Sequence, residues 1–125
     1  MSNANEKLGF VGLGMMGLPM VSNLLDGGYP VTVFDLDETT VNKAVALGAS
    51  SASSAAELAA QSDIIITMVP DSHHVEAVIA GPDGILEGIN AGSIVIDMST
   101  IDPEMGKKMA NLIEAKGSYF VDAPV

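Results

Sequence analysis

The chain contains no cysteine, tryptophan or arginine, and only 4% of its 125 residues are aromatic. Without cysteine there can be no disulfide, thiolate metal ligand or cysteine nucleophile, which fits a reducing compartment such as the cytoplasm. Five lysines face 16 acidic residues, and the formal net charge is −11. A surface this acidic argues against nucleic acid and an anionic membrane surface as partners. No apolar run reaches the length that a membrane span needs.

What the chain has is enough apolar content to fold: 48% of its residues are hydrophobic and 17% are charged. This composition is typical of an ordered globular domain. A chain of 125 residues is expected to form one domain with a sizeable core.

A glycine-rich stretch follows the first apolar run, and Gly12, Gly14 and Gly17 have the GxGxxG spacing. Such a triplet is a weak signal alone. Here a strand pattern precedes it, a helical pattern follows, and Asp35 lies at the end of the next strand pattern. In a dinucleotide site the first glycine permits a sharp turn, the second admits a pyrophosphate, and the third allows close helix packing. The N–H groups at the helix start would bind the phosphates. The alternative is a tight strand–turn–helix connection without a ligand.

Strand patterns alternate with helical patterns along the whole chain. Strands are expected at residues 8–12, 31–35, 50–52, 63–69, 93–97 and 119–121. Helices are expected at 16–26 and 37–47, from 54 onward, from 71 or 72 onward, and at 102–117. On the second helix, Val41, Ala44 and Val45 are expected to face inward, and residues 81–84 form a turn.

Helices of about ten residues between strands imply right-handed crossovers and a parallel sheet. We therefore predict an α/β fold, a three-layer Rossmann domain over residues 8–125. Its sheet should be doubly wound and mainly parallel, with strand order 3-2-1-4-5-6. Residues 1–7 are expected to be a disordered or tag-like terminus.

In such a sheet the ligand lies beyond the carboxyl ends of the strands, and Asp35 stands at one of them. Its carboxylate can accept both ribose hydroxyls of an adenosine. Its charge would repel a 2′-phosphate, and no cation lies close by in the sequence. We therefore predict NAD rather than NADP as cofactor. The alternative is an aspartate that caps a turn or helix, for which Asp37 is better placed.

Two further strand ends carry candidate binding residues. Met68, Val69 and Pro70 form a rigid apolar end that can wall one side of the cofactor, or that simply ends a strand. Ser99 and Thr100 offer two hydroxyls for a nicotinamide, a ribose or a substrate carboxylate. The alternative for this pair is to cap the next helix.

Leu13, Met15 and Met16 complete the expected phosphate loop. His73 and His74 lie in the first turn of a helix, where histidines are most often solvated or packed. They have no third ligand at metal spacing, so no metal site is expected. No Ser-His-Asp or paired-carboxylate arrangement stands out, and no catalytic residue is expected in this chain.

Four segments together resemble the β-hydroxyacid dehydrogenase family, close to 3-hydroxyisobutyrate dehydrogenase and tartronate semialdehyde reductase. They are Phe10–Met20, Met68–Pro70, Asp97–Ile101 and Asp122–Val125. The resemblance implies that Met68–Pro70 lies beside the cofactor and that Thr100 lies near the nicotinamide. It also implies that the fourth segment opens a loop that holds the substrate carboxylate.

Members of that family are more than twice as long, and their catalytic lysine lies in a second, all-helical domain. None of the five lysines here matches it, so this helical catalytic and dimerisation domain is expected to be absent from the chain. The resemblance implies a domain that binds NAD without turnover. The full-length protein would be a homo-oligomer that transfers hydride between NAD and a small 3-hydroxy acid.

Two alternatives are a non-catalytic nucleotide-sensing Rossmann module and the cofactor domain of an imine reductase. The sensing module would need only the glycine loop and Asp35. Imine reductases generally prefer NADP, which Asp35 disfavours.

Overall fold

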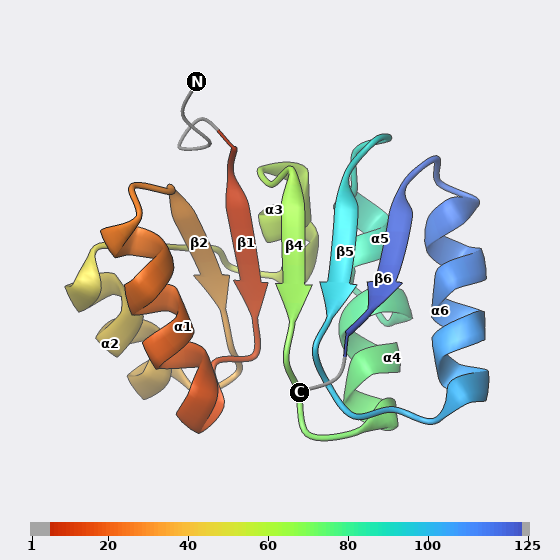
Figure 1. Ribbon diagram of the computed structural model, residues 1–125, viewed down its shortest axis with the longest axis horizontal. Helices are drawn as coiled ribbons and strands as arrows, with labels where there is room; N and C mark the ends of the chain where they lie inside the picture. Colours follow the sequence, from red (N-terminus) through yellow and green to blue (C-terminus); the bar gives the residue numbers. More distant parts are fainter. Residues whose placement is uncertain (1–5, 124–125) are drawn as a thin grey trace.

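The computed structural model describes residues 6–123, with residues 14 and 15 described only in their backbone. A six-stranded sheet runs through its centre (Figure 1). Its strands are β1 (Leu8–Val11), β2 (Val31–Phe34), β3 (Ser50–Ser51), β4 (Ile64–Thr67), β5 (Ile94–Asp97) and β6 (Tyr119–Asp122). The order is β3-β2-β1-β4-β5-β6, and each neighbouring pair is parallel. The predicted α/β fold and strand order are confirmed.

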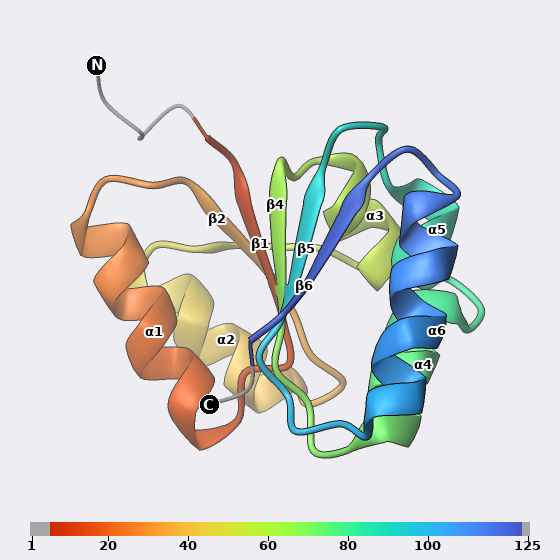
Figure 2. The same ribbon diagram turned by 45° about the vertical axis from the view of Figure 1, so that its right-hand side comes forward.

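Helices cover both faces of the sheet, which makes three layers. They are α1 (Gly14–Asp26), α2 (Glu38–Leu47), α3 (Ala55–Ala60), α4 (Ser72–Ala80), α5 (Ile85–Gly88) and α6 (Pro103–Glu114). Helices α1 and α2 lie on one face, and α3 to α6 lie on the other (Figure 2). The chain therefore changes faces after β3, as a doubly wound sheet requires.

Four of the helices begin at a side chain that binds a free N–H group of the first turn. Asp37, Ser54, Asp71 and Asp102 each accept such a bond, at the starts of α2, α3, α4 and α6. Caps of this kind satisfy donors that have no partner within the helix. For α4 the structure selects Asp71 rather than Ser72.

The structure differs from the sequence prediction in several local features. Strand β4 is shorter than the predicted 63–69, and α6 ends at Glu114 rather than at 117. Helix α1 begins at Gly14, two residues early, and the expected turn at 81–84 leads into the unpredicted short helix α5, whose Ile85 is fully buried. Ala44 is buried and Val41 half-buried, but Val45 is 43% exposed. Successive helical residues are rotated by about 100°, so Val45 turns away from the sheet that Ala44 contacts.

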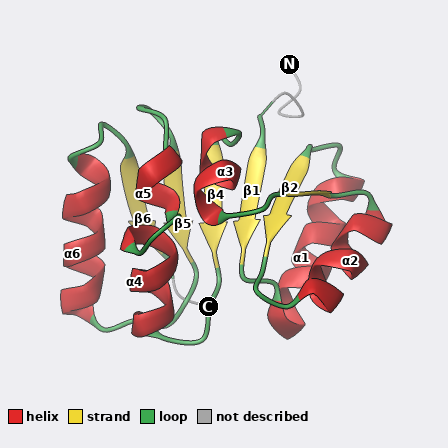
Figure 3. Cartoon of the chain, turned by 180° about the vertical axis from the view of Figure 1, so that it is seen from behind, coloured by secondary structure: helices red, strands yellow, loops and turns green. Residues whose placement is uncertain are grey.

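Two apolar clusters fill the spaces between the layers. Phe10 and Val33 belong to the cluster under α1 and α2, whereas Ile65 and Val95 belong to the one under α3 to α6. Figure 3 shows α3 to α6 on their face of the sheet. Because strand residues alternate between faces, the central strands supply both clusters. All six strands point the same way, so their carboxyl ends meet at one edge (Figure 1).

The sequence predicts a disordered or tag-like terminus at residues 1–7. Residues 1–5 of this segment lie outside the described residues. Lys7 is bound to the fold. Its N–H donates to the Asp63 carboxylate at 2.9 Å, and its carbonyl accepts from the Asp63 N–H at 2.8 Å.

Candidate dinucleotide site

The chain leaves β1 through a turn that requires glycine. Gly12 has φ +86°, in the left-handed region. A Cβ there would overlap the backbone oxygen of Met68 and lie 2.7 Å from Val69 Cγ1. A Cβ at Gly17 would lie 3.2 Å from the Gly12 oxygen and 3.3 Å from Phe10 Cε1. The first glycine thus makes the turn, and Gly17 lets α1 pack closely on it, as the sequence predicts.

Helix α1 starts without a side-chain cap. Its N-cap residue, Leu13, makes no capping bond, and the first turn contains no acid. Gly14, Met15 and Met16 are the first three helical residues, and Met16 is 57% exposed. Early N–H groups of a helix lack helical partners and carry partial positive charge. This end of α1 therefore suits an anion such as a pyrophosphate.

Asp35 ties the loop after β2 to the loop after β1. Its Oδ2 accepts a bond from the Leu13 N–H at 2.7 Å, and its Oδ1 accepts one from the Asp37 N–H at 2.9 Å. The structure therefore brings Asp35 to the phosphate loop. A carboxylate has about four acceptor positions, so each oxygen can accept a further bond. Asp37 caps α2, as predicted for it.

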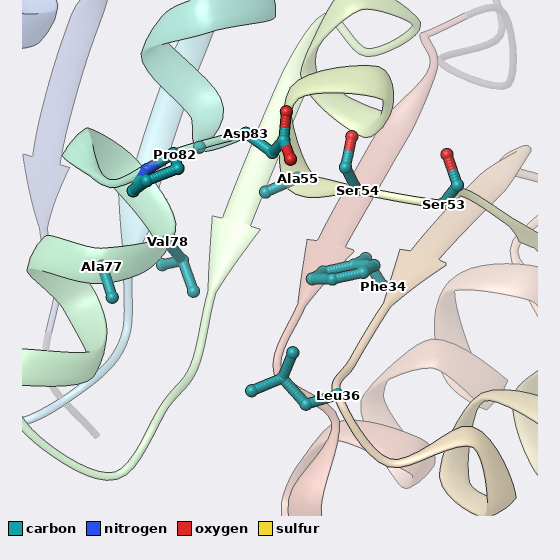
Figure 4. Close-up of a pocket in the computed structure, with 10 residues that line it drawn as sticks. Phe34, Leu36, Ser53, Ser54, Ala55, Ala77, Val78, Pro82 and Asp83 are labelled. Atoms are coloured by element: carbon teal, nitrogen blue, oxygen red, sulfur yellow. The ribbon is translucent and has the colours of Figure 1, made fainter.

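Two hollows that share Phe34, Leu36 and Val78 are lined largely by apolar side chains, and Asp35 lines the smaller of them. Figure 4 shows Phe34 and Leu36 on one side of the larger hollow, with Ala77 and Val78 of α4 opposite. Leu36 is 87% exposed and, with Phe34 and Val78, lines both hollows. The larger, about 350 Å³, is lined by Phe34, Leu36, Ser53, Ser54, Ala55, Ala77, Val78, Pro82, Asp83 and Gly84. The smaller, about 230 Å³, is lined by Val11, Gly12, Phe34, Asp35, Leu36, Val69, Pro70, His74 and Val78.

A third hollow, of about 440 Å³, is more polar and also borders Asp35. Its charged side chains are the carboxylates of Asp35 and Glu38, and Asn42 and two serines add polar groups. The lining residues are Phe34, Asp35, Glu38, Val41, Asn42, Ser51, Ala52 and Ser53. The electrostatic potential of this hollow is therefore negative.

The ends of β4 and β5 are joined by side-chain hydrogen bonds. The Val69 N–H donates to Ser99 Oγ at 2.8 Å, and the Ser99 N–H donates to Asp97 Oδ1 at 3.1 Å. Ser99 is buried, whereas Thr100 is exposed. Neither caps the next helix, because Asp102 does. The hydroxyl of Ser99 holds Val69, and direct contact of Ser99 or Thr100 with a ligand stays a prediction.

Asp97 is a residue whose importance the sequence did not reveal. It is the last residue of the strand predicted at 93–97; the structure shows it fully buried, and burial raises the pKa of its carboxyl. Its Oδ1 also accepts a bond from Thr67 Oγ1 at 2.8 Å. The available signal was an acid directly after three apolar residues, Ile94–Ile96.

His74 lies at the edge of the smaller hollow, and His73 is exposed. His74 Nδ1 lies 2.9 Å from the Asp71 carboxylate, and this hydrogen bond holds the pKa of Asp71 below its usual value. Within residues 6–123, no three His, Cys, Asp or Glu side chains gather as a metal site. Over the same range, no helix combines the length and apolar character needed to cross a membrane.

The glycine turn, the open helix start and Asp35 all lie beside the point between β1 and β4 where the strand order reverses. Open α/β sheets bind nucleotides at this point. Fold and site together define a Rossmann-type dinucleotide-binding domain. The chain belongs to the family of the NAD binding domain of 6-phosphogluconate dehydrogenase, whose model matches residues 7–125.

Curated relatives narrow the comparison to hydroxyacid dehydrogenases. The chain is 46% identical over 119 residues to 2-(hydroxymethyl)glutarate dehydrogenase of Eubacterium barkeri, covering 95% of this chain and 40% of that protein. It is 44% identical to mitochondrial 3-hydroxyisobutyrate dehydrogenase of Mus musculus, covering 94% of this chain and 35% of that protein. It thus spans well under half the length of these relatives.

Solved structures share the fold closely. A 3-hydroxyisobutyrate dehydrogenase with L-serine from Mycobacterium tuberculosis superimposes with a TM-score of 0.90 at 34% identity, covering 100% of this chain and 41% of that one. Psf3 in complex with NADP+ and 2-OPP has a TM-score of 0.88 at 28% identity, covering 94% of this chain and 42% of that one. An imine reductase from Pseudomonas sp. has a TM-score of 0.81 at 25% identity, covering 94% of this chain and 40% of that one.

Proposed function

We propose that this chain is the cofactor domain of an oxidoreductase that transfers hydride between NAD and a small 3-hydroxy acid. The observation that carries the proposal is the 2.7 Å bond from the Leu13 N–H to Asp35 Oδ2. It joins the expected phosphate loop to the expected ribose anchor on neighbouring strands. The hydroxyacid dehydrogenases that are 46% and 44% identical support the reaction class.

The described residues fit the two halves of NAD. The apolar side chains of Phe34, Leu36 and Val78 suit the adenine, and Asp35 suits the hydroxyls of its ribose. The pyrophosphate would lie on the N–H groups at the start of α1, which begins at Gly14 directly after the Gly12 turn. We expect the nicotinamide half to lie beyond Met68–Pro70, toward Ser99 and Thr100. When bound, the nicotinamide supplies or accepts the hydride.

We expect NAD to bind better than NADP because of the third, polar hollow. A 2′-phosphate there would meet Asp35 and Glu38, and no cation lines this hollow. One like-charge pair at about 4 Å costs roughly 1 kcal/mol in water and about 4 kcal/mol near a protein surface. A structural neighbour that is 28% identical is a complex with NADP+. The preference for NAD is therefore proposed from the two acids of this chain.

The lysines of this chain do not support proton transfer at the proposed site. Lys43 lies on α2, Lys107 and Lys108 on α6, and Lys7 before β1. None of the five lines any of the three hollows, and Lys108 pairs with Glu76. We therefore propose that the chain binds NAD but does not oxidise substrate by itself.

The test combines binding with turnover. NADH should raise the melting temperature of the purified chain, whereas NAD with 3-hydroxyisobutyrate should produce no NADH. An active 3-hydroxyisobutyrate dehydrogenase under the same conditions is the control. Steady NADH formation by this chain would contradict the proposal that it does not oxidise substrate by itself. If NADH does not change the melting temperature, the proposal that the chain binds the cofactor is wrong.

The cofactor domain of an imine reductase is the second candidate, and the solved imine reductase at 25% identity favours it. Such a domain should prefer NADP, so the two acids argue against it. A nucleotide-sensing module is the non-catalytic alternative. For the whole protein we propose a cytoplasmic homo-oligomer, from the missing cysteine and the family resemblance, with neither nucleic acid nor membrane as partner because of the −11 charge.

A further inference from the structure

Asp97 is a buried acid to which the proposed function assigns no part. It ends β5, its exposed fraction is 0%, and its Oδ2 has no hydrogen-bond partner among residues 6–123. A buried polar atom without a partner is destabilising, and such atoms are few in folded proteins. An apolar residue would fill this place at lower cost, so the carboxyl group calls for a reason.

The Oδ1 atom of Asp97 gives that reason, because it gathers two donors from different segments. Thr67 Oγ1 donates from the end of β4 at 2.8 Å, and the Ser99 N–H donates from the loop after β5 at 3.1 Å. The two strands are already paired, with Thr67 opposite Asp97. Asp97 thus adds side-chain hydrogen bonds to the backbone pairing at the ends of β4 and β5. We call the bonds that link Thr67, Asp97, Ser99 and Val69 the joint.

The joint continues from Ser99 into the proposed site. Ser99 Oγ accepts the Val69 N–H at 2.8 Å, and Val69 lines the smaller hollow. A chain of hydrogen bonds therefore runs from Asp97 through Ser99 to the backbone of Val69, just after the end of β4.

We infer that Asp97 is a positioning residue for the nicotinamide half of the cofactor, acting through Ser99 on the backbone of Val69. The inference rests on the proposed function. Asp35 anchors the adenosine half beside β2, so the nicotinamide half falls at the ends of β4 and β5, which Asp97 joins. Loss of Asp97 should therefore disturb one half of the site and spare the other.

The role needs an acceptor oxygen but no negative charge. Burial raises the pKa of the Asp97 carboxyl, and the charge of Asp122 on β6, its register partner, adds to the rise. The neutral carboxylic acid is thereby favoured over a wider pH range than usual. An amide can supply the same oxygen, so Asp97→Asn should keep the joint and Asp97→Ala should break it.

The experiment measures two dissociation constants for the purified 125-residue chain, one for NADH and one for ADP-ribose, which lacks the nicotinamide. Asp97→Ala should weaken NADH binding about tenfold, the size expected when buried donors lose their acceptor. ADP-ribose binding should change less than about twofold, and Asp97→Asn should restore NADH binding to within about twofold of the parent. If Asp97→Ala does not fold, Thr67→Val removes one of the two donors to Asp97 Oδ1 with little change of shape and should show the same selective loss.

Each outcome decides the inference. Equal weakening of both ligands would show a merely structural role and overturn it, as would no change in either. Failure of Asp97→Asn to restore binding would contradict the neutral acceptor. If the parent chain binds neither ligand, the proposed function fails and the inference fails with it; binding of both with no effect of Asp97→Ala removes the inference alone.

Discussion

Asp35 performs two tasks with one carboxylate. Its two oxygens hold the N–H groups of Leu13 and Asp37, which fixes the loops after β1 and β2. Its charge and that of Glu38 border the polar hollow where a 2′-phosphate would lie. The first task holds the two loops together and the second is the proposed basis of cofactor choice, so a suitable variant should separate them.

Asp35→Asn removes the charge and keeps one acceptor oxygen. The ratio of NADH to NADPH affinity should fall about tenfold, because a repulsion of roughly 1 to 4 kcal/mol disappears. The measurement is a pair of fluorescence titrations on each protein, since a ratio cancels losses common to both cofactors.

Asp37→Asn is the matched control for this experiment. It removes an equal charge two residues away and keeps the cap of α2, because asparagine caps helices as well as aspartate does. Its ratio should equal that of the parent. An equal shift in both variants, or none in Asp35→Asn, would contradict the role given to Asp35.

Among the elements, the close approach of β1 and β4 shapes the site. The chain leaves β1 at Gly12, where the backbone after β4 passes directly against it. Met68 contributes to this contact through its N–H, which donates to the Val11 carbonyl at 2.9 Å. The start of α1 is thus set by the neighbouring strand, and this explains why a glycine is needed there.

Gly12→Ala should destabilise the fold by more than about 3 kcal/mol, because it adds a steric overlap to the cost of a left-handed residue. Gly92→Ala is a matched control, since Gly92 has φ +91° and open space around a Cβ. It should cost only about 1 to 2 kcal/mol. Chemical unfolding measures both, and equal losses would show that the β4 contact is unimportant.

The elements also show how far sequence carries the prediction. Glycine spacing, caps and strand–helix alternation are local signals, so the fold, the strand order and the place of Asp35 were predictable. The hydrogen bond from Thr67 to Asp97 joins residues 30 positions apart in the sequence, so no local sequence pattern predicts it. Helix α5 is only four residues long, too short for a periodic signal, and the exposure of Val45 follows from tertiary packing.

For the whole molecule, the size of the chain relative to its relatives bears on which part of the proposed reaction it can perform. The described residues form a six-stranded sheet that carries the proposed cofactor site, and the chain spans 40% and 35% of the length of two curated relatives. A domain with a net charge of −11 must bind an anionic cofactor through local N–H groups rather than through its overall field. We propose that the N–H groups at the start of α1 and the Gly12 turn supply that local attraction.

We propose above all that the strand ends of this chain bind NAD in preference to NADP. The most direct measurement is titration of the 125-residue chain with NADH and with NADPH, following nicotinamide fluorescence. We expect saturable one-to-one binding of NADH, with NADPH binding at least about tenfold weaker. Tighter binding of NADPH, or no saturation with either cofactor, would contradict it.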